Sequence, residues 1–141
     1  MLNLLRLSHY TGDTGLEEKA RELARAFSRV AGESSQLMGY TMLLCALDYA
    51  LGPSSEVVLV GRSDDVDLLD MLRAIRSRFL PSNVVVVVSG DEIGKVALFT
   101  KDMVQIEDRA TAYVCSGQTC QLPATSPEEM IALLGNIEKT D

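Results

Sequence analysis

The chain has 141 residues and a formal net charge of −7, with 47% hydrophobic and 23% charged residues. A chain of this length can bury enough surface to fold as one domain, or as a small domain with a helical appendage, without a disulfide or metal scaffold. The composition excludes wholesale disorder, the acidic balance argues against a nucleic-acid-binding module, and no apolar run is long enough to predict a membrane span.

Cysteine content and the N-terminal residues both favour a cytoplasmic location. Three cysteines are too few for a disulfide scaffold, and their odd number fits a reducing compartment better than secretion. The apolar residues at 2–7 are neither preceded by a basic region nor followed by a small-residue cleavage site, so no signal peptide is predicted.

Two helices are predicted at the start of the chain. Leucines at 2–7 have a helical pattern, which breaks at 10–13. The second helix is expected to begin at Thr14, whose hydroxyl caps it while Glu17 reaches back. Apolar residues then recur at intervals of three and four between positions 16 and 31, so this helix has one apolar face.

A third helix is predicted from Ser34 or Ser35 to Gly52, where a glycine and the following proline end it. Between 37 and 51 its single charged residue is Asp48, which we interpret as a buried, hydrogen-bonded carboxylate. Apolar side chains occupy most of the circumference of this helix. It therefore requires neighbours on nearly every side, more than the first two helices supply.

Two runs of β-branched residues, 56–60 and 84–88, predict buried strands. Continuous apolar runs of this kind are typical of parallel strands that are covered on both faces. Between them lies a helix with aspartates near its start and arginines near its end, as the helix dipole favours. Its apolar stripe comprises Leu68, Leu69, Leu72, Ile75 and Phe79. Strand, helix and strand together predict a right-handed βαβ unit.

The last third of the chain is less uniform. Residues 89–110 contain a turn followed by a segment that fits either a strand or a helical turn, and no element is assigned there. A third strand is predicted at 111–115. The last helix begins after the cap Ser126, with Pro127 in the first helical position and Glu129 in the third. Its buried stripe is expected to comprise Met130, Ile131, Leu133, Leu134 and Ile137.

Together these elements predict an α/β fold. An N-terminal helical hairpin is followed by a small, mainly parallel βαβ sheet in two or three layers. The change of character after Pro53 predicts a boundary between a helical segment, 1–53, and a small α/β domain, 54–141.

Cys115 and Cys120 are the candidate redox residues. They flank a glycine-containing turn at the end of a predicted strand, where two thiols can form a disulfide, exchange electrons or supply half of a metal site. No metal is predicted, because His9 is the single histidine and Cys45 is expected to be a small core residue. The flanking residues carry no charge that would stabilise a thiolate. We therefore favour structural thiols and keep a redox pair as the alternative.

The loops after the first two strands are candidate ligand loops, because α/β proteins bind ligands at the carboxyl ends of strands. The chain has no GxGxxG motif and no Walker lysine, and the first loop carries two aspartates that repel phosphate. A helix cap at Ser63 or Asp64, and a simple turn after the second strand, are the favoured interpretations. The candidate residues are Gly61, Ser63, Asp64, Ser89, Gly90 and Asp91. No catalytic residue and no cofactor are predicted.

Three stretches, in this order and spacing, resemble a known family. The first covers residues 2–13 and starts Leu-Asn-Leu-Leu-Arg-Leu, and the second, 46–58, contains Ala-Leu-Asp-Tyr-Ala-Leu-Gly-Pro. The third is Ala112-Tyr113-Val114-Cys115 with Cys120 and Pro123. Across residues 2–135 the chain resembles the C-terminal end of thioredoxin-domain-containing proteins related to spermatogenesis-associated thioredoxin-like protein.

The resemblance implies a longer architecture, with an N-terminal thioredoxin-like domain and an α/α barrel similar to six-hairpin glycosidases and sugar epimerases. The helical segment would then correspond to the last barrel helices, and the upstream thioredoxin-like and barrel regions would be its partners. Self-association is the other way to cover its apolar surface. The thioredoxin CxxC motif is absent from this chain, and no catalytic residue is carried over from the family.

The predicted function is a C-terminal structural or interaction module without a complete active site of its own. Two alternatives remain open. One is a thiol–disulfide module that uses the two cysteines, and the other is an α/β domain that binds a small ligand in its loops.

Overall fold

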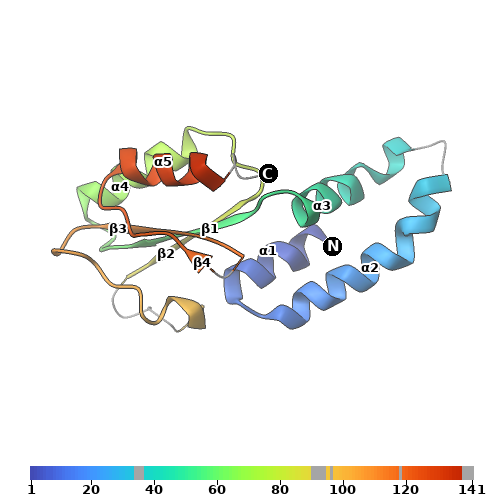
Figure 1. Ribbon diagram of the computed structural model, residues 1–141, viewed down its shortest axis with the longest axis horizontal. Coiled ribbons are helices and arrows are strands. Elements are labelled where there is room, and N and C mark those ends of the chain that lie inside the picture. The colour runs from blue at the N-terminus through green and yellow to red at the C-terminus, as the bar shows by residue number, and fades with distance from the viewer. Residues whose placement is uncertain (34–36, 90–94, 96, 118, 138–141) are drawn as a thin grey trace. The chain divides into compact units, whose positions relative to one another are not determined.

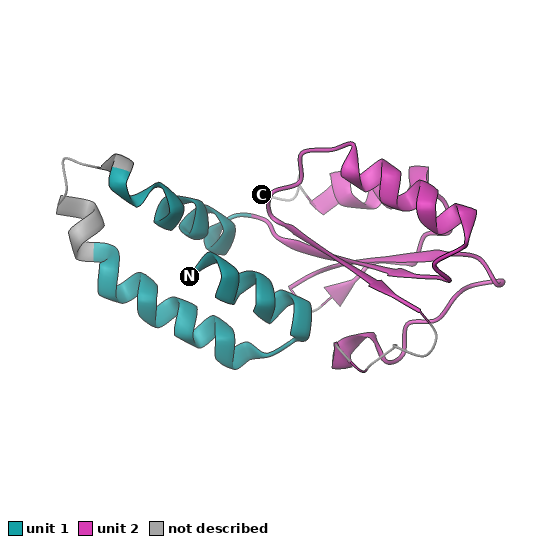
Figure 2. Cartoon of the chain, turned by 180° about the vertical axis from the view of Figure 1, so that it is seen from behind, with its two compact units in different colours: residues 1–52 teal, residues 53–141 magenta. Residues whose placement is uncertain are grey.

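The computed structural model describes residues 1–33, 37–89, 95, 97–117 and 119–137. The chain divides into two compact units, residues 1–52 and 53–141, which are coloured separately in Figure 2. We refer to them as the helical unit and the α/β unit. The α/β class predicted from the sequence is confirmed, with five α-helices and a four-stranded sheet in the described residues.

The helical unit is built from three α-helices and a short 3₁₀ helix. These are α1 (Leu2–Thr11), α2 (Thr14–Glu33), η1 (Leu37–Tyr40) and α3 (Thr41–Leu51), shown from blue to green in Figure 1. α1 packs against both α2 and α3. The start predicted for the third helix, near Ser34 or Ser35, lies outside the described residues. The helix that follows begins at Thr41, after the 3₁₀ turn.

The turn between α1 and α2 explains where α1 ends and where α2 begins. Gly12 has a left-handed backbone, with φ 78°, and its amide donates to the carbonyl of Ser8 over 2.7 Å. Left-handed geometry favours glycine and closes α1. The amide of Gly15 donates to the Asp13 carboxylate over 2.9 Å. The side chain that caps α2 is therefore that of Asp13, and the prediction that Thr14 caps it was wrong.

The α/β unit contains a mixed sheet with strand order β2-β1-β3-β4. Its elements are β1 (Ser55–Val60), α4 (Val66–Arg76), β2 (Asn83–Val88), η2 (Leu98–Thr100), β3 (Thr111–Ser116), β4 (Thr119–Cys120) and α5 (Pro127–Ile137). β1 and β2 are parallel, as the βαβ pattern predicts, but β3 pairs antiparallel with β1, and β4 antiparallel with β3. The prediction of a mainly parallel sheet was therefore wrong. A parallel strand requires a crossover connection, and between β2 and β3 the described residues form η2 but no α-helix.

α4 and α5 lie side by side on one face of the sheet (Figure 1). The strand residues of this face alternate with those of the other, so Val57, Leu59 and Val114 face the two helices. On the opposite face the Tyr113 hydroxyl donates to the carbonyl of Val104 over 2.8 Å, which ties the segment after η2 to the sheet. Both faces of β1 are buried, which accounts for its continuous apolar sequence.

The ends of α4 and α5 differ in how well the sequence predicted them. α5 begins as expected, because the Glu129 amide donates to the Ser126 hydroxyl over 3.3 Å and its carboxylate accepts from the Thr125 amide over 3.2 Å. Asp65 occupies the N-cap position of α4, without a side-chain cap hydrogen bond, so the cap predicted at Ser63 or Asp64 was wrong. α4 also ends at Arg76. Phe79, predicted within its apolar stripe, is 90% exposed.

Candidate functional site

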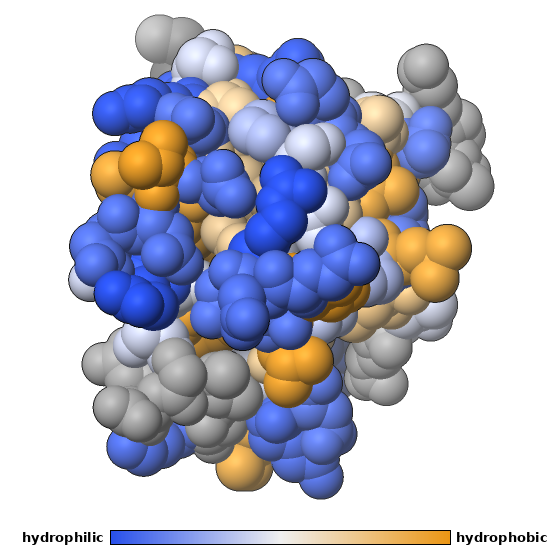
Figure 3. Space-filling view, turned by 90° about the vertical axis from the view of Figure 1, so that its left-hand side faces the viewer, coloured by the Kyte–Doolittle hydropathy of each residue, from blue (hydrophilic) through white to orange (hydrophobic). Residues whose placement is uncertain are grey.

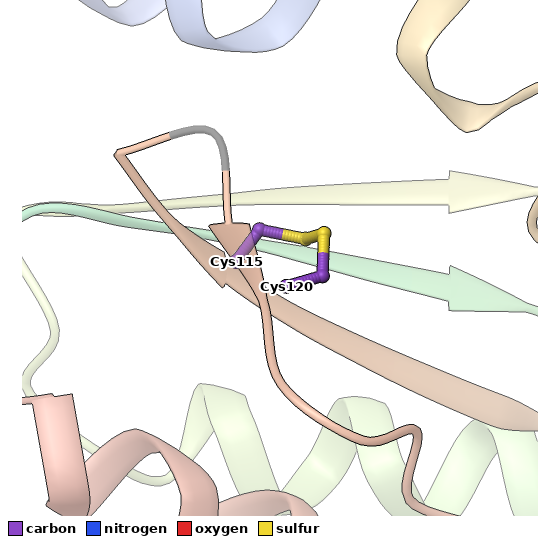
Figure 4. Close-up of a disulfide and its surroundings, with 2 residues drawn as sticks. All are labelled: Cys115 and Cys120. Atoms are coloured by element: carbon purple, nitrogen blue, oxygen red, sulfur yellow. A yellow bond between two sulfur atoms is a disulfide. The ribbon is translucent and has the colours of Figure 1, made fainter.

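The two candidate cysteines lie opposite each other at the end of the sheet. Cys115 is in β3 and Cys120 in β4, and the two are direct partners in the antiparallel ladder. Their Cα atoms are 3.9 Å apart and their Sγ atoms form a disulfide of 2.06 Å. The turn between the strands includes Gly117, whose φ of 55° is left-handed and favours glycine. Figure 4 shows the disulfide on the side of the strands that faces away from α4 and α5.

The two sulfur-bearing residues have different environments. Cys115 is 3% exposed, whereas Cys120 lies in the exposed strand β4. The β1 residue paired with Cys115 is Glu56, so the sheet register brings a carboxylate, rather than a cation, to this position. A cation is what activates a cysteine as a nucleophile. The register thus places a carboxylate, and not a cation, directly opposite Cys115 in β1.

Backbone amides of the loop after β1 already donate hydrogen bonds within the protein. The Gly61 amide donates to the carbonyl of Val88 over 3.2 Å, and the Arg62 amide donates to the Asp65 carboxylate over 2.9 Å. Gly61 is buried, and a Cβ atom there would lie 3.3 Å from the Ala110 Cβ. Close packing accounts for this glycine. A phosphate site requires free amides, so the geometry gives no support to an anion site in this loop.

Arg62 and Asp64 form an exposed ion pair in the same loop. The guanidinium approaches the carboxylate with both Nε and Nη2, over 3.2 and 2.9 Å. The hydrogen bond from Arg62, followed by a backbone hydrogen bond and the arginine charge, lowers the pKa of Asp64 below its ordinary value. The same pair raises the pKa of Arg62. At pH values above this lowered pKa, Asp64 is therefore ionised and paired with Arg62.

Replacing Arg62 with alanine should raise the pKa of Asp64 toward its ordinary value, because the largest cause of its lowering is removed. In the native chain the lowered pKa favours the folded state above the ordinary pKa, and this preference is lost as the pH falls through the lowered value. A carboxyl NMR titration of Asp64 measures the change. Arg76→Ala, which removes an arginine from the last turn of α4, is the control. An unchanged Asp64 pKa in Arg62→Ala would contradict the pairing.

Of the candidates after β2, Ser89 is half-buried, while Gly90 and Asp91 lie outside the described residues. Because β1 and β2 are parallel, their carboxyl ends share one edge of the sheet.

Figure 3 shows the protein from the side at which the segment before β3, orange in Figure 1, protrudes. Hydrophilic residues predominate on the described part of this side, and hydrophobic residues form separate patches among them.

Two other residues, Asp48 and Cys45, were interpreted from the sequence, and the structure corrects both interpretations. Asp48 is exposed, so its interpretation as a buried carboxylate was wrong. Cys45 is a free, exposed cysteine rather than a core residue. His9 lies in the last turn of α1, where its ring meets Tyr49 edge-on at a centroid distance of 5.5 Å. The contact gives this histidine a packing role.

The part of the chain that the structure describes contains neither a metal-ligand cluster nor a membrane-spanning helix. Within these residues, no group of three or more His, Cys, Asp or Glu side chains is arranged to hold a metal ion. Among the helices that the structure describes, none is both long and apolar enough to cross a membrane.

The helical unit has a surface feature that the sequence did not place. A hollow of about 420 Å³ lies among the start of α1, the middle of α2 and the residues from Gly39 to Leu43. Most of its lining is apolar, and Leu23 and Phe27 of α2 contribute to it while remaining exposed. The signal in the sequence was the apolar character of the third helix around its circumference. That pattern indicated missing neighbours but not their location.

The chain is homologous to a region of a much longer protein. Spermatogenesis-associated protein 20 of Homo sapiens is 31% identical over 136 residues, which cover 94% of this chain and 17% of that protein. The Mus musculus and Rattus norvegicus proteins of the same name are each 30% identical with the same coverage. This homology confirms the resemblance noted in the sequence and is consistent with a C-terminal region. No family model matches the chain, and no solved structure matches it.

Proposed function

We propose that this homologue of a region of spermatogenesis-associated protein 20 is a structural or interaction module that docks against further helices and has no complete active site of its own. The observation that carries the proposal is the exposed apolar surface of the helical unit. Among its described side chains, the exposed large hydrophobic residues are Leu7, Leu23, Phe27, Met42, Leu44 and Leu51. Apolar surface of this kind marks a site of association.

α3 illustrates the argument best. Ala46 and Tyr49 are buried, yet Met42 and Leu51, on the same helix, are 68% and 83% exposed. A helix of a small soluble unit ordinarily has polar residues on its exposed side. The exposed apolar residues of α3 are therefore explained by a second layer of helices that packs against them.

The chain spans 17% of the length of the curated relatives it matches, so those relatives contain ample sequence to supply the missing layer. The family resemblance identifies that layer with an α/α barrel similar to six-hairpin glycosidases, and it adds an upstream thioredoxin-like domain as a second partner. We place the assembly in the cytoplasm, on the basis of the low, odd number of cysteines. Self-association is the substitute that we expect when the chain is isolated.

The isolated chain should bind a hydrophobic dye and sediment faster as its concentration rises, because its exposed helices associate with each other. Replacing Met42 and Leu44 together with glutamate should reduce both effects by placing charge on the exposed side of α3. Sedimentation velocity at several concentrations, with dye fluorescence, measures them.

The control is Leu122→Glu, which changes an exposed leucine in the α/β unit and should leave dye binding and sedimentation unchanged. A parent chain that remains strictly monomeric and binds no dye would overturn the proposal. Equal effects of the control and of the double variant would also overturn it, because the association would not then depend on α3.

A further inference from the structure

We propose that Cys120 is a site of reversible thiolation, at which a small thiol of the glutathione class forms a mixed disulfide, and that Cys115 is the thiol that resolves it. This inference does not depend on the docking role of the helical unit, because both cysteines lie in the α/β unit. It rests on the difference in access to the two cysteines and on the hydrogen bonds that hold the hairpin around them.

Access distinguishes the two cysteines. Thiol–disulfide exchange requires the incoming thiolate to reach one sulfur of the bond, and its rate depends on which sulfur is accessible. Cys120 lies in β4, whose two residues are both exposed, and follows a turn at the end of the hairpin. Cys115 is buried in β3. The geometry therefore directs an external thiol to the Cys120 sulfur.

Backbone hydrogen bonds hold the hairpin independently of the disulfide. The Gln121 amide donates to the carbonyl of Val114 over 2.9 Å, immediately beside the cysteine pair. Ala112 and Ala124 exchange both of their backbone hydrogen bonds, over 2.8 and 2.9 Å. These bonds keep the two cysteines opposite each other after the disulfide opens. The disulfide can then form again without refolding, because the two cysteines are already in position.

The disulfide also closes a short loop, with a sequence separation of 5. Closing a short loop removes less entropy from the unfolded chain than closing a long one, so this bond stabilises the fold less than a long-range disulfide would. A bond that is accessible, and that closes only a short loop, is suited to reversible opening.

The exchange balances in atoms and electrons. A small thiolate attacks the Cys120 sulfur, the bond to Cys115 breaks, and Cys115 leaves as a thiolate that takes up a proton. The result is a mixed disulfide on Cys120. A second small thiol then attacks the sulfur of the bound one, releasing Cys120 and forming the small-molecule disulfide, so two electrons pass to the protein. In the reverse direction, Cys115 attacks the mixed disulfide on Cys120 and expels the small thiol.

The test uses oxidised glutathione as the probe, with variants that each retain one cysteine of the pair. Cys45 is replaced by serine in every protein, because it is free and exposed. In Cys115→Ser the remaining Cys120 should form a mixed disulfide at least tenfold faster than Cys115 does in Cys120→Ser, as intact-mass spectrometry measures. Since the β1 residue opposite Cys115 is Glu56 and not a cation, labelling of Cys115 in the reduced protein near pH 6 should remain slow.

A second measurement leaves both Cys115 and Cys120 in place, so its result does not depend on whether a variant of either cysteine folds correctly. The reduced Cys45→Ser protein is mixed with oxidised glutathione, quenched with acid and digested, and the peptide that carries glutathione is identified. Glutathione on Cys120, and full interconversion of dithiol and disulfide across a series of glutathione mixtures, would support the proposal. A rate difference below tenfold, glutathione on Cys115, or a pair that stays in one state across the series would overturn it.

Discussion

Leu134→Ala should lower the free energy of unfolding of the α/β unit by about 2–5 kcal/mol, enough to threaten a domain of ordinary stability. Leu134 lies in α5, is 3% exposed and belongs to the cluster formed by α4, α5 and the sheet. Truncation removes buried methyl groups and leaves a cavity that the surrounding strands cannot fill completely. Urea unfolding of the variant, followed by circular dichroism, measures the loss.

Leu122→Ala is the matched control, since it makes the same chemical change at a residue of the α/β unit that is 85% exposed. Its free energy of unfolding should differ from that of the parent by no more than about 0.5 kcal/mol. Similar, small effects of both substitutions would show that α5 is a loose appendage. The helix-facing side of the sheet would then lack half of its cover.

Tyr49→Ala should destabilise the helical unit by about 3–5 kcal/mol, the range measured for truncating large buried aromatic side chains. Tyr49 is buried in α3, its ring contacts His9 edge-on, and the Arg6 guanidinium lies 5.9 Å from its ring centroid. Aromatic and cation–π contacts add to the loss of buried area. The substitution therefore removes the contacts of α3 with both His9 and Arg6 of α1 in one step.

Hydrogen exchange of the α1 and α3 amides reports on this unit separately from the sheet. Protection of both helices should fall in Tyr49→Ala and remain at the parent level in Phe79→Ala, which truncates an exposed aromatic residue of the α/β unit. Unchanged protection in Tyr49→Ala would mean that α1 and α3 are held together by other contacts.

Local sequence signals predicted most elements of the α/β unit correctly. The valine-rich runs became β1 and β2, and the start of α5 follows from three residues whose side chains act within one turn. Such features depend on short-range chemistry that the sequence contains in full. The direction of β3 was not accessible in the same way. It depends on the path of the chain after β2, where the sequence contains no helix or strand of clear periodicity.

The errors in the helical unit share a physical cause. Apolar composition around α3 led to the expectation that Cys45 was buried, and the same pattern made Asp48 a buried carboxylate. Composition shows that a helix needs neighbours, but burial of a given residue depends on where those neighbours are. In this chain they cover the side with Ala46 and Tyr49 and leave the other side exposed.

The sequence predicted which two residues form the candidate site, but not how they are arranged in space. Spacing around a glycine identified Cys115 and Cys120, whereas β4 is too short to leave a pattern in the sequence. The ladder register that makes the two cysteines direct partners therefore emerged only from the structure. In the loop after β1, the sequence likewise identified the charged residues but not the hydrogen bonds that occupy its amides.

The two edge strands of the sheet differ in how readily each could pair with another molecule. β4 ends one side with only two residues, and a short edge strand offers little template for pairing with another molecule. β2 stands last on the other side, and of the described strands only β1 pairs with it. Residues 84–88 of β2 are five consecutive valines without a charge or proline, which is the composition of segments that assemble into cross-β fibrils. When the sheet opens, association between copies of the chain would therefore begin at β2.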